Sequence, residues 1–131
     1  MKLLLDTHAL LWGLAGSPKL GPQARARIVD PASTVWVSAA TAWEIAIKAG
    51  LGRLDLGEPP EICIPREMER GGFLWLPVTA EHAFGVRTLP MHHGDPFDRL
   101  LVAQAGIEGL TLVTADAILS AYRVPLLNAS T

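Results

Sequence analysis

Two acidic residues stand at the ends of short apolar runs in this sequence. Asp6 directly follows the run of leucines at 3–5. The apolar run at 110–113 is followed by Thr114, and Asp116 lies two residues beyond Thr114. Such continuous apolar runs are typical of strands that are buried on both faces of a parallel sheet. Ligands of these sheets bind beyond the carboxyl ends of the strands. We therefore expect Asp6 and Asp116 to lie at the same edge of one sheet.

Two further acids lie in segments of helical period that should begin at that edge. Glu44 is about two turns into the segment that follows Val37, on a face that it shares with Thr41 and Lys48. Asp98 lies in the first turn of another helical segment. The carboxylates that we predict to converge from separate parts of the chain are Asp6, Glu44, Asp98 and Asp116.

Converging carboxylates repel one another, so such a cluster stays ionised only when cations sit within it. Hard oxygen ligands select Mg²⁺ or Mn²⁺. Ions of this kind can ionise a water molecule and hold a phosphate for in-line attack, so no nucleophilic side chain is required. The cluster therefore predicts metal-dependent phosphodiester hydrolysis, with the four acids as both metal ligands and catalytic residues.

Each acid also has an alternative, purely structural interpretation. Asp98 could favour the dipole of its own helix, and Glu44 precedes Lys48 by four residues, the favoured order for an ion pair on a helix. Asp116 could start a short helix at 117–122. Asp6 is the hardest to explain in this way, because the sequence suggests no cap or partner near it.

Other polar residues allow two interpretations each. His92 and His93, together with Asp95, could form a transition-metal site, but a solvated loop is favoured because no helical His spacing accompanies them. Arg99 and Lys48 flank two of the acids and could contact phosphate or be solvated charges. For the tryptophans we expect core packing, with base stacking as the alternative; these are Trp12, Trp36, Trp43 and Trp75.

The elements that must position the acids follow from the period of the apolar residues. Apolar runs predict strands at 3–5, 35–37 and 110–113, with two more near 73–78 and 124–127. Helical patterns predict helices at 39–51 and 96–106, and weaker ones at 9–15, 22–29, 60–70 and 80–87. Ser38 and Asp95 are the expected N-caps, and Pro96 suits a first helical position. Strands that alternate with helices predict an α/β fold with a parallel sheet covered on both faces.

The composition limits the remaining possibilities. A chain of 131 residues that is 50% hydrophobic suits a single domain over 1–131. Its apolar stretches are too short to cross a bilayer, and the acid at position 6 interrupts what could otherwise be a signal-peptide core. The lone Cys63 allows no internal disulfide. We therefore expect a cytoplasmic protein.

Four ordered motifs resemble those of the PIN-domain family, and within it the VapC-type toxins of toxin–antitoxin pairs. The motifs are LLLDTHALLW, SAATAWEIAIKAGLGRL, LPMHHGDPFDRLLVAQA and LTLVTAD, in this order along nearly the whole chain. Their acids are the four residues selected above.

The resemblance implies a three-layer PIN-like fold, a site that binds Mg²⁺ or Mn²⁺, and RNA as the substrate. It also implies that the hydroxyl of Thr114 supports the metal site, and that the partners are a small cognate antitoxin protein and a second copy of the chain in a homodimer. The net charge of −2 provides no basic stripe for RNA. The metal ions would therefore have to offset part of the repulsion between protein and RNA.

Two alternatives remain open from the sequence. A phosphoacceptor signalling domain shares the size and the parallel sheet, but its pattern has adjacent acids after the first strand, where this chain has Thr7 and His8 after Asp6. A catalytically silent PIN-like scaffold would bind a partner without cutting RNA. The presence of all four acids argues against that loss of activity.

Overall fold

A five-stranded, fully parallel sheet forms the centre of the computed structural model, which describes all residues 1–131. The strands lie in the order β3-β2-β1-β4-β5. Their bounds are β1 Lys2–Leu5, β2 Thr34–Ser38, β3 Leu74–Leu76, β4 Thr111–Thr114 and β5 Leu126–Asn128. The chain therefore starts in the middle of the sheet, builds one half and then returns to build the other.

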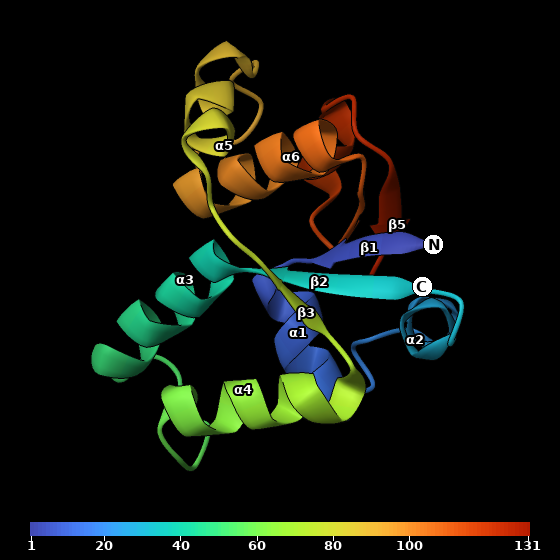
Figure 1. Cartoon of the computed structure of the whole chain (residues 1–131), viewed down its shortest axis with the longest axis vertical. Coiled ribbons are helices and arrows are strands. Elements are labelled where there is room, and N and C mark those ends of the chain that lie inside the picture. Colours follow the sequence, from blue (N-terminus) through green and yellow to red (C-terminus); the bar gives the residue numbers. More distant parts are fainter.

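Helices cover both faces of the sheet (Figure 1). They are α1 Thr7–Leu14, α2 Pro22–Val29, α3 Ala39–Gly50, α4 Pro60–Gly71, α5 Ala80–Gly85 and α6 Pro96–Glu108, with short 3₁₀ helices η1 Val86–Thr88 and η2 Ala117–Ala121. One core cluster joins the sheet to α1, α2, α3 and α4, and a second joins it to α6 and η2. The predicted three-layer α/β fold is therefore confirmed. No helix is both long and apolar enough to cross a membrane.

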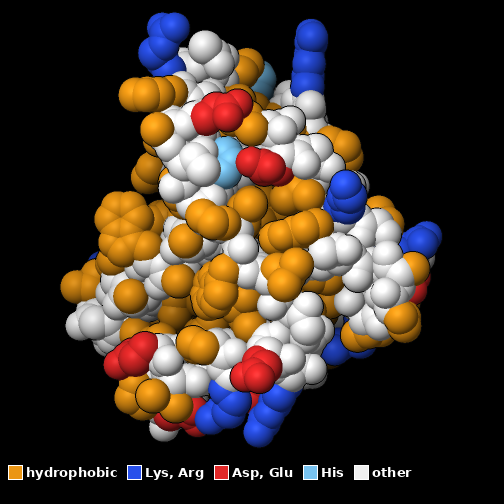
Figure 2. Space-filling view, in the orientation of Figure 1, with side chains coloured by type: hydrophobic (Ala, Val, Ile, Leu, Met, Phe, Trp, Pro, Cys, Tyr) orange, Lys and Arg blue, Asp and Glu red, His pale blue; other side chains and the backbone are white.

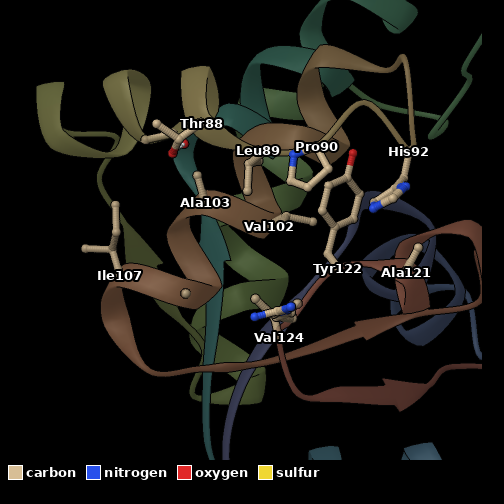
Figure 3. A pocket seen from close by; sticks show the side chains of 13 residues that line it. Thr88, Leu89, Pro90, His92, Val102, Ala103, Ile107, Ala121, Tyr122 and Val124 are labelled. Atoms are coloured by element: carbon tan, nitrogen blue, oxygen red, sulfur yellow. Dashed lines mark hydrogen bonds between the residues drawn. The ribbon is translucent and has the colours of Figure 1, made fainter.

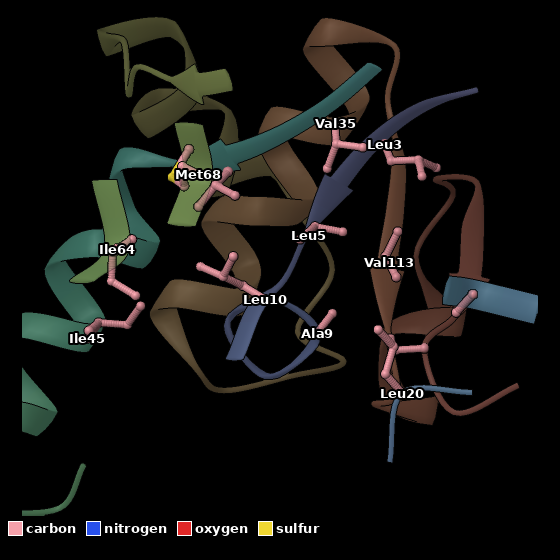
Figure 4. Packing of buried hydrophobic residues seen from close by; sticks show 13 residues of the cluster. Leu3, Leu5, Ala9, Leu10, Leu20, Val35, Ile45, Ile64, Met68 and Val113 are labelled. Carbon is pink, nitrogen blue, oxygen red and sulfur yellow. The ribbon is translucent and has the colours of Figure 1, made fainter. Parts of the chain in front are cut away.

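Alternate residues of β1 point into different core clusters. Leu3 and Leu5 pack in the cluster that Figure 4 shows, whereas Leu4 packs on the other face of the sheet. All three side chains are at most 1% exposed. Burial on both faces explains why this strand is a continuous apolar run rather than an alternating one.

The strand register brings the polar residues that follow the strands to one edge of the sheet. Leu5 is aligned with Val37 of β2 and with Val113 of β4. The next residues, Asp6, Ser38 and Thr114, therefore lie at the same carboxyl edge. The order of the strands reverses between β1 and β4, and this switch point is where open α/β sheets bind their ligands.

The predicted elements are all present, with small differences at their ends. Helix α1 begins at Thr7 instead of residue 9, because Asp6 caps it. The helix predicted at 80–87 is α5 followed by η1. The fifth strand begins at Leu126, two residues later than predicted.

Candidate metal centre

A small polar cavity lies at the carboxyl edge of the sheet, with a volume of about 120 Å³. It is lined by Asp6, Thr7, His8, Glu44, Lys48, Asp95, Asp98, Ala115 and Asp116. All four acids predicted from the sequence are in this set. They come from four separate segments of the chain, as the strand-end argument required.

Asp6 lies between β1 and α1 and is 5% exposed. The N–H of Ala9 donates to its Oδ1 at 2.8 Å, so Asp6 is the N-cap of α1, and the expectation that no cap lay nearby was wrong. Burial raises the pKa of this carboxyl above its ordinary value, and the nearby charge of Glu44 adds to the effect. Hydrogen bonds from the Thr114 hydroxyl and the Ala9 N–H oppose the rise.

Glu44 projects from the second turn of α3, whose N-cap is Ser38, as predicted. It is 8% exposed, and both of its oxygens have partners. Oε1 accepts a short hydrogen bond from the Thr7 hydroxyl, and Oε2 lies 2.8 Å from Nζ of Lys48. The predicted ion pair with Lys48 is therefore present, but the carboxylate also lines the cavity, so the structural and the functional interpretations do not exclude each other.

Asp95 and Asp98 lie at the start of α6 and differ in their contacts. Oδ1 of Asp95 accepts hydrogen bonds from the N–H groups of Phe97 and Asp98 at 2.8 and 3.2 Å, so Asp95 is the N-cap, as predicted. Asp98 accepts no hydrogen bond on its carboxylate. Burial raises the pKa of Asp98 to about 7, and the negative charges of Asp95 and Asp6 contribute to the rise.

Asp116 follows β4 and is held through both oxygens. The Ile118 N–H donates to Oδ1 at 3.0 Å, so Asp116 starts the short helix η2, as its structural interpretation predicted. His93 Nε2 lies 2.7 Å from Oδ2. The backbone N–H of Asp116 donates to the hydroxyl of Thr114 at 3.1 Å. Thr114 thus touches both acids that follow the central strands, Asp6 and Asp116.

His93 is the residue of the site that the sequence argument missed. The expectation of a solvated loop holds for His92, which is exposed and packs edge-on against Tyr122, but it was wrong for His93. His93 Nε2 lies 3.5 Å from Oδ2 of Asp98 as well as 2.7 Å from Asp116. These three groups offer possible ligand atoms within 4.8 Å of one another. Only the tertiary structure reveals this, because no local pattern distinguishes the two histidines.

Arg99 neither lines the cavity nor faces solvent, so both interpretations of it, a phosphate contact and a solvated charge, were wrong. It is 7% exposed, and its guanidinium donates to loop carbonyls and to a hydroxyl. Its acceptors are the carbonyl oxygens of Val86, Leu89, Pro90 and His93 and the hydroxyl of Tyr122. Arg99 therefore fixes the loop that carries His93. Among the residues that line the cavity, Lys48 is the only lysine or arginine.

The tryptophans divide into two groups. Trp12 and Trp36 are partly buried and pack against the core, as expected. Trp43 and Trp75 are 62% and 41% exposed, so the expectation of core packing was wrong for these two. Trp43 packs edge-on against Phe97 with ring centroids 5.3 Å apart.

A larger, mainly apolar cavity of about 540 Å³ lies between α6, η1 and η2 (Figure 3). Leu89, Val102, Tyr122 and Val124 are among its lining residues, and none of the residues that line it is an acid. Its volume exceeds that of the acidic cavity, but no carboxylate lines it. The four acids predicted from the sequence all line the smaller cavity.

The residues of the acidic cavity fit a divalent cation with a preference for oxygen ligands. Asp6 and Asp98 both have raised pKa values, because burial and neighbouring carboxylates disfavour their charged forms. A cation bound between them would offset both effects. The donors are carboxylate oxygens, which suit Mg²⁺ and Mn²⁺.

Known proteins share the sequence pattern and the fold of this chain. Residues 3–125 match the PIN domain. Ribonuclease VapC22 of Mycobacterium tuberculosis is 30% identical over 134 aligned positions, which cover 94% of this chain and 93% of the relative. Ribonuclease VapC16 of the same organism is 39% identical over 61 positions, which cover 47% of this chain and 42% of that protein.

Solved structures share the fold. The chain aligns with VapBC2 from Rickettsia felis, bound to a promoter DNA fragment, with a TM-score of 0.73 and 18% identity over 98% of each chain. It aligns with DNA-bound VapBC from Salmonella typhimurium with a TM-score of 0.69 and 18% identity over 97% of each chain. The motif match, the identity to VapC22 and the shared fold together establish that this chain belongs to the PIN-domain family.

Proposed function

We propose that this protein is a ribonuclease that uses Mg²⁺ or Mn²⁺ to hydrolyse RNA phosphodiester bonds. The observation that carries the proposal is the cavity at the carboxyl edge, where Asp6, Glu44, Asp98 and Asp116 meet from four segments of the chain. The names of the relatives VapC22 and VapC16 as ribonucleases support the same activity.

The four acids would hold the cation, and three of them have hydrogen-bond partners that hold them in place. Asp6 and Asp116 are each fixed by a backbone N–H at the start of a helical segment, and Glu44 is fixed by Thr7. When bound, Mg²⁺ or Mn²⁺ would supply a water of lowered pKa and a counter-charge for the phosphate. Lys48, at the side of the cavity, provides a positive charge for a neighbouring phosphate oxygen.

The test of activity is cleavage of total cellular RNA by the purified, antitoxin-free protein, with and without Mn²⁺, followed by sequencing of the new ends. We expect cleavage with Mn²⁺ and none after chelation with EDTA. The matched variants are Asp98→Asn, which changes a residue that lines the cavity, and Asp55→Asn, which changes an exposed residue that does not line it. Undiminished cutting in EDTA, or by Asp98→Asn, would contradict the metal mechanism.

We also propose that the protein acts in the cytoplasm as the toxin of a toxin–antitoxin pair. Several solved structures that share its fold are described as VapBC or toxin–antitoxin complexes, which supports a small protein partner. Expression of the parent should slow growth, and the product of a neighbouring reading frame should bind the protein and restore growth. Expression of Asp6→Asn should be harmless. Unimpaired growth at high levels of the parent protein would count against the toxin role.

A third part of the proposal is that two copies associate through the outer face of α3. Trp43, Ile47 and Leu51 recur at every fourth position and are 62%, 39% and 63% exposed. This spacing forms an apolar stripe along one side of a helix. A second copy could bury the stripe against its own equivalent, as in the isologous contacts of two-fold dimers.

The catalytically silent scaffold is the second candidate function. It would require the acids to serve only as caps and ion pairs, and Asp6, Glu44 and Asp116 do make such contacts. It does not account for Asp98, whose carboxylate is partly buried among other acids without a hydrogen-bond donor. A phosphoacceptor domain is set aside because the chain belongs to the PIN-domain family.

A further inference from the structure

His93 has both ring nitrogens engaged, and the two contacts determine where its proton lies. The backbone N–H of Asp95 points at Nδ1 at 2.9 Å. A backbone N–H can only donate, so Nδ1 must accept and carries no proton. The neutral ring must then hold its proton on Nε2, which lies 2.7 Å from Oδ2 of Asp116 and 3.5 Å from Oδ2 of Asp98.

We propose that His93 is a positioning residue of the metal centre, a neutral Nε2–H donor that fixes the carboxylate of Asp116 beside Asp98, and not a metal ligand. The inference rests on the proposed metal-dependent function. By proximity alone, the side chains of His93, Asp98 and Asp116 could be taken as a set of three metal ligands.

Metal ligation would require the opposite arrangement of the ring. A histidine ligand presents a lone pair to the ion and usually donates its other N–H to a carboxylate or carbonyl. If Nε2 of His93 bound the ion, the proton would have to lie on Nδ1, where it would face the N–H of Asp95. Two donors would then point at each other, and the cap residue of α6 would lose a hydrogen bond. The donor role requires no such rearrangement.

The surroundings of His93 are built to hold this orientation. Its backbone N–H donates to the hydroxyl of Tyr122 at 3.1 Å, and the same hydroxyl accepts from Arg99. With His93 on one oxygen and the Ile118 N–H on the other, both oxygens of Asp116 are fixed. Because each oxygen retains a second acceptor direction, Asp116 can still face a cation while these bonds are in place.

The first test is the tautomer, read from ¹⁵N chemical shifts of the imidazoles in protein with labelled histidine. His93→Gln identifies the resonance of His93 by its loss. We expect a neutral ring protonated on Nε2 in the metal-free protein and also after addition of Mg²⁺, which is diamagnetic and prefers oxygen ligands. A ring protonated on Nδ1 in either state, or an Nε2 resonance shifted by direct coordination, would overturn the proposal.

The second test is metal affinity, measured by calorimetry without RNA for Mg²⁺ and for Mn²⁺. His93→Gln retains an N–H donor of similar reach and should bind both ions within a few-fold of the parent. His93→Ala should lose roughly 10- to 100-fold for both ions, the effect typical of removing an outer partner of a ligand. His92→Ala, the exposed neighbour, is the control and should bind like the parent.

The outcomes separate this inference from the proposed function. Equal losses in His93→Gln and His93→Ala, larger for Mn²⁺ than for Mg²⁺, would identify a nitrogen ligand and overturn the positioning role. Parent-like binding by His93→Ala would overturn it as well. A parent that binds neither ion would instead contradict the metal-dependent function, while an Nδ1-protonated ring in the metal-free protein would contradict the inference alone. Circular dichroism of each variant verifies that it is folded.

Discussion

Asp98 has the least support among the four acids of the cavity. Asp6 and Asp116 accept backbone hydrogen bonds, and Glu44 has Thr7 and Lys48 as partners. Asp98 has only the more distant Nε2 of His93, at 3.5 Å. Its charge is therefore poorly compensated without a cation, which is why burial can raise its pKa to about 7.

The raised pKa of Asp98 predicts how stability depends on pH in the absence of metal. The ordinary value is 3.8 and the folded value is about 7, so between these values the folded protein binds more protons than the unfolded chain. The free energy of unfolding should then fall as pH rises through this window. The raised pKa of Asp6 acts in the same direction. Thermal melts in EDTA should show that the melting temperature falls more steeply with rising pH in the parent than in Asp98→Asn. Equal slopes in the two proteins would contradict the raised pKa of Asp98.

The sign of the stability change in Asp98→Asn separates a metal site from an interaction with the helix dipole. Loss of a favourable contact with the helix dipole should cost at most about 1 kcal/mol. Removal of a repelled charge should instead raise the melting temperature in EDTA above that of the parent at pH 8. Excess Mg²⁺ should stabilise the parent according to RT ln(1 + [L]/Kd), and the mutant less.

The control variant for the melting experiment is Asp55→Asn. Asp55 is an exposed acid that accepts a hydrogen bond from the Gly57 N–H. Its melting temperature should not rise in EDTA, and its response to Mg²⁺ should match that of the parent. If Asp98→Asn melts lower than the parent in EDTA and keeps the full response to Mg²⁺, Asp98 serves only the dipole of α6.

At the scale of the elements, short apolar runs predicted the strands, and apolar residues at helical spacing predicted the helices. The meeting of Asp6 and Asp116 followed from the general rule that parallel strands share a carboxyl edge. The capping bond of Asp6 was missed because the first turn of α1 continues directly from β1. The role of His93 could not be predicted, since its partner Asp116 is 23 residues away and the loop has no regular period.

Arg99 illustrates the same limit, because a buried arginine with carbonyl partners cannot be distinguished in sequence from a surface charge. Arg99→Lys should destabilise the protein by about 2 kcal/mol or more, since several carbonyls of the loop lose a donor. Urea unfolding measures this change. Arg87→Lys, an exposed arginine of η1, should change stability by less than about 0.5 kcal/mol. Equal effects of the two substitutions would show that Arg99 does not hold the loop.

At the scale of the whole molecule, exposed hydrophobic residues lie along α3 and on the face that carries β3. The outer face of α3 carries Trp43 and Ile47, and Leu51 follows at the C-cap of the helix. Hydrophobic side chains also gather on the face that carries β3 (Figure 2), where Leu74 and Trp75 are 48% and 41% exposed. Apolar surface of this kind on a small domain typically marks contacts with other chains.

The α3 stripe predicts self-association. Light scattering should give the mass of a dimer for the parent, and Ile47→Glu should shift the mass towards that of a monomer, because it places two like charges in the contact. Val29→Glu changes an apolar residue that is 69% exposed on α2 and should leave the mass unchanged. A monomeric parent at tens of micromolar, or an Ile47→Glu variant that remains a dimer, would contradict the proposed contact.

The most direct test of the central claim is the rate at which the purified protein cuts RNA as a function of Mg²⁺ or Mn²⁺ concentration. The account predicts a rate that rises to saturation with metal, falls to background in EDTA, and drops about 1000-fold, equivalent to about 4 kcal/mol of activation free energy, in Asp98→Asn at saturating metal. Asp55→Asn should retain the rate of the parent. Cleavage that is independent of metal, or that survives in Asp98→Asn at the rate of the parent, would contradict the claim that the acids at the carboxyl edge are the catalytic centre.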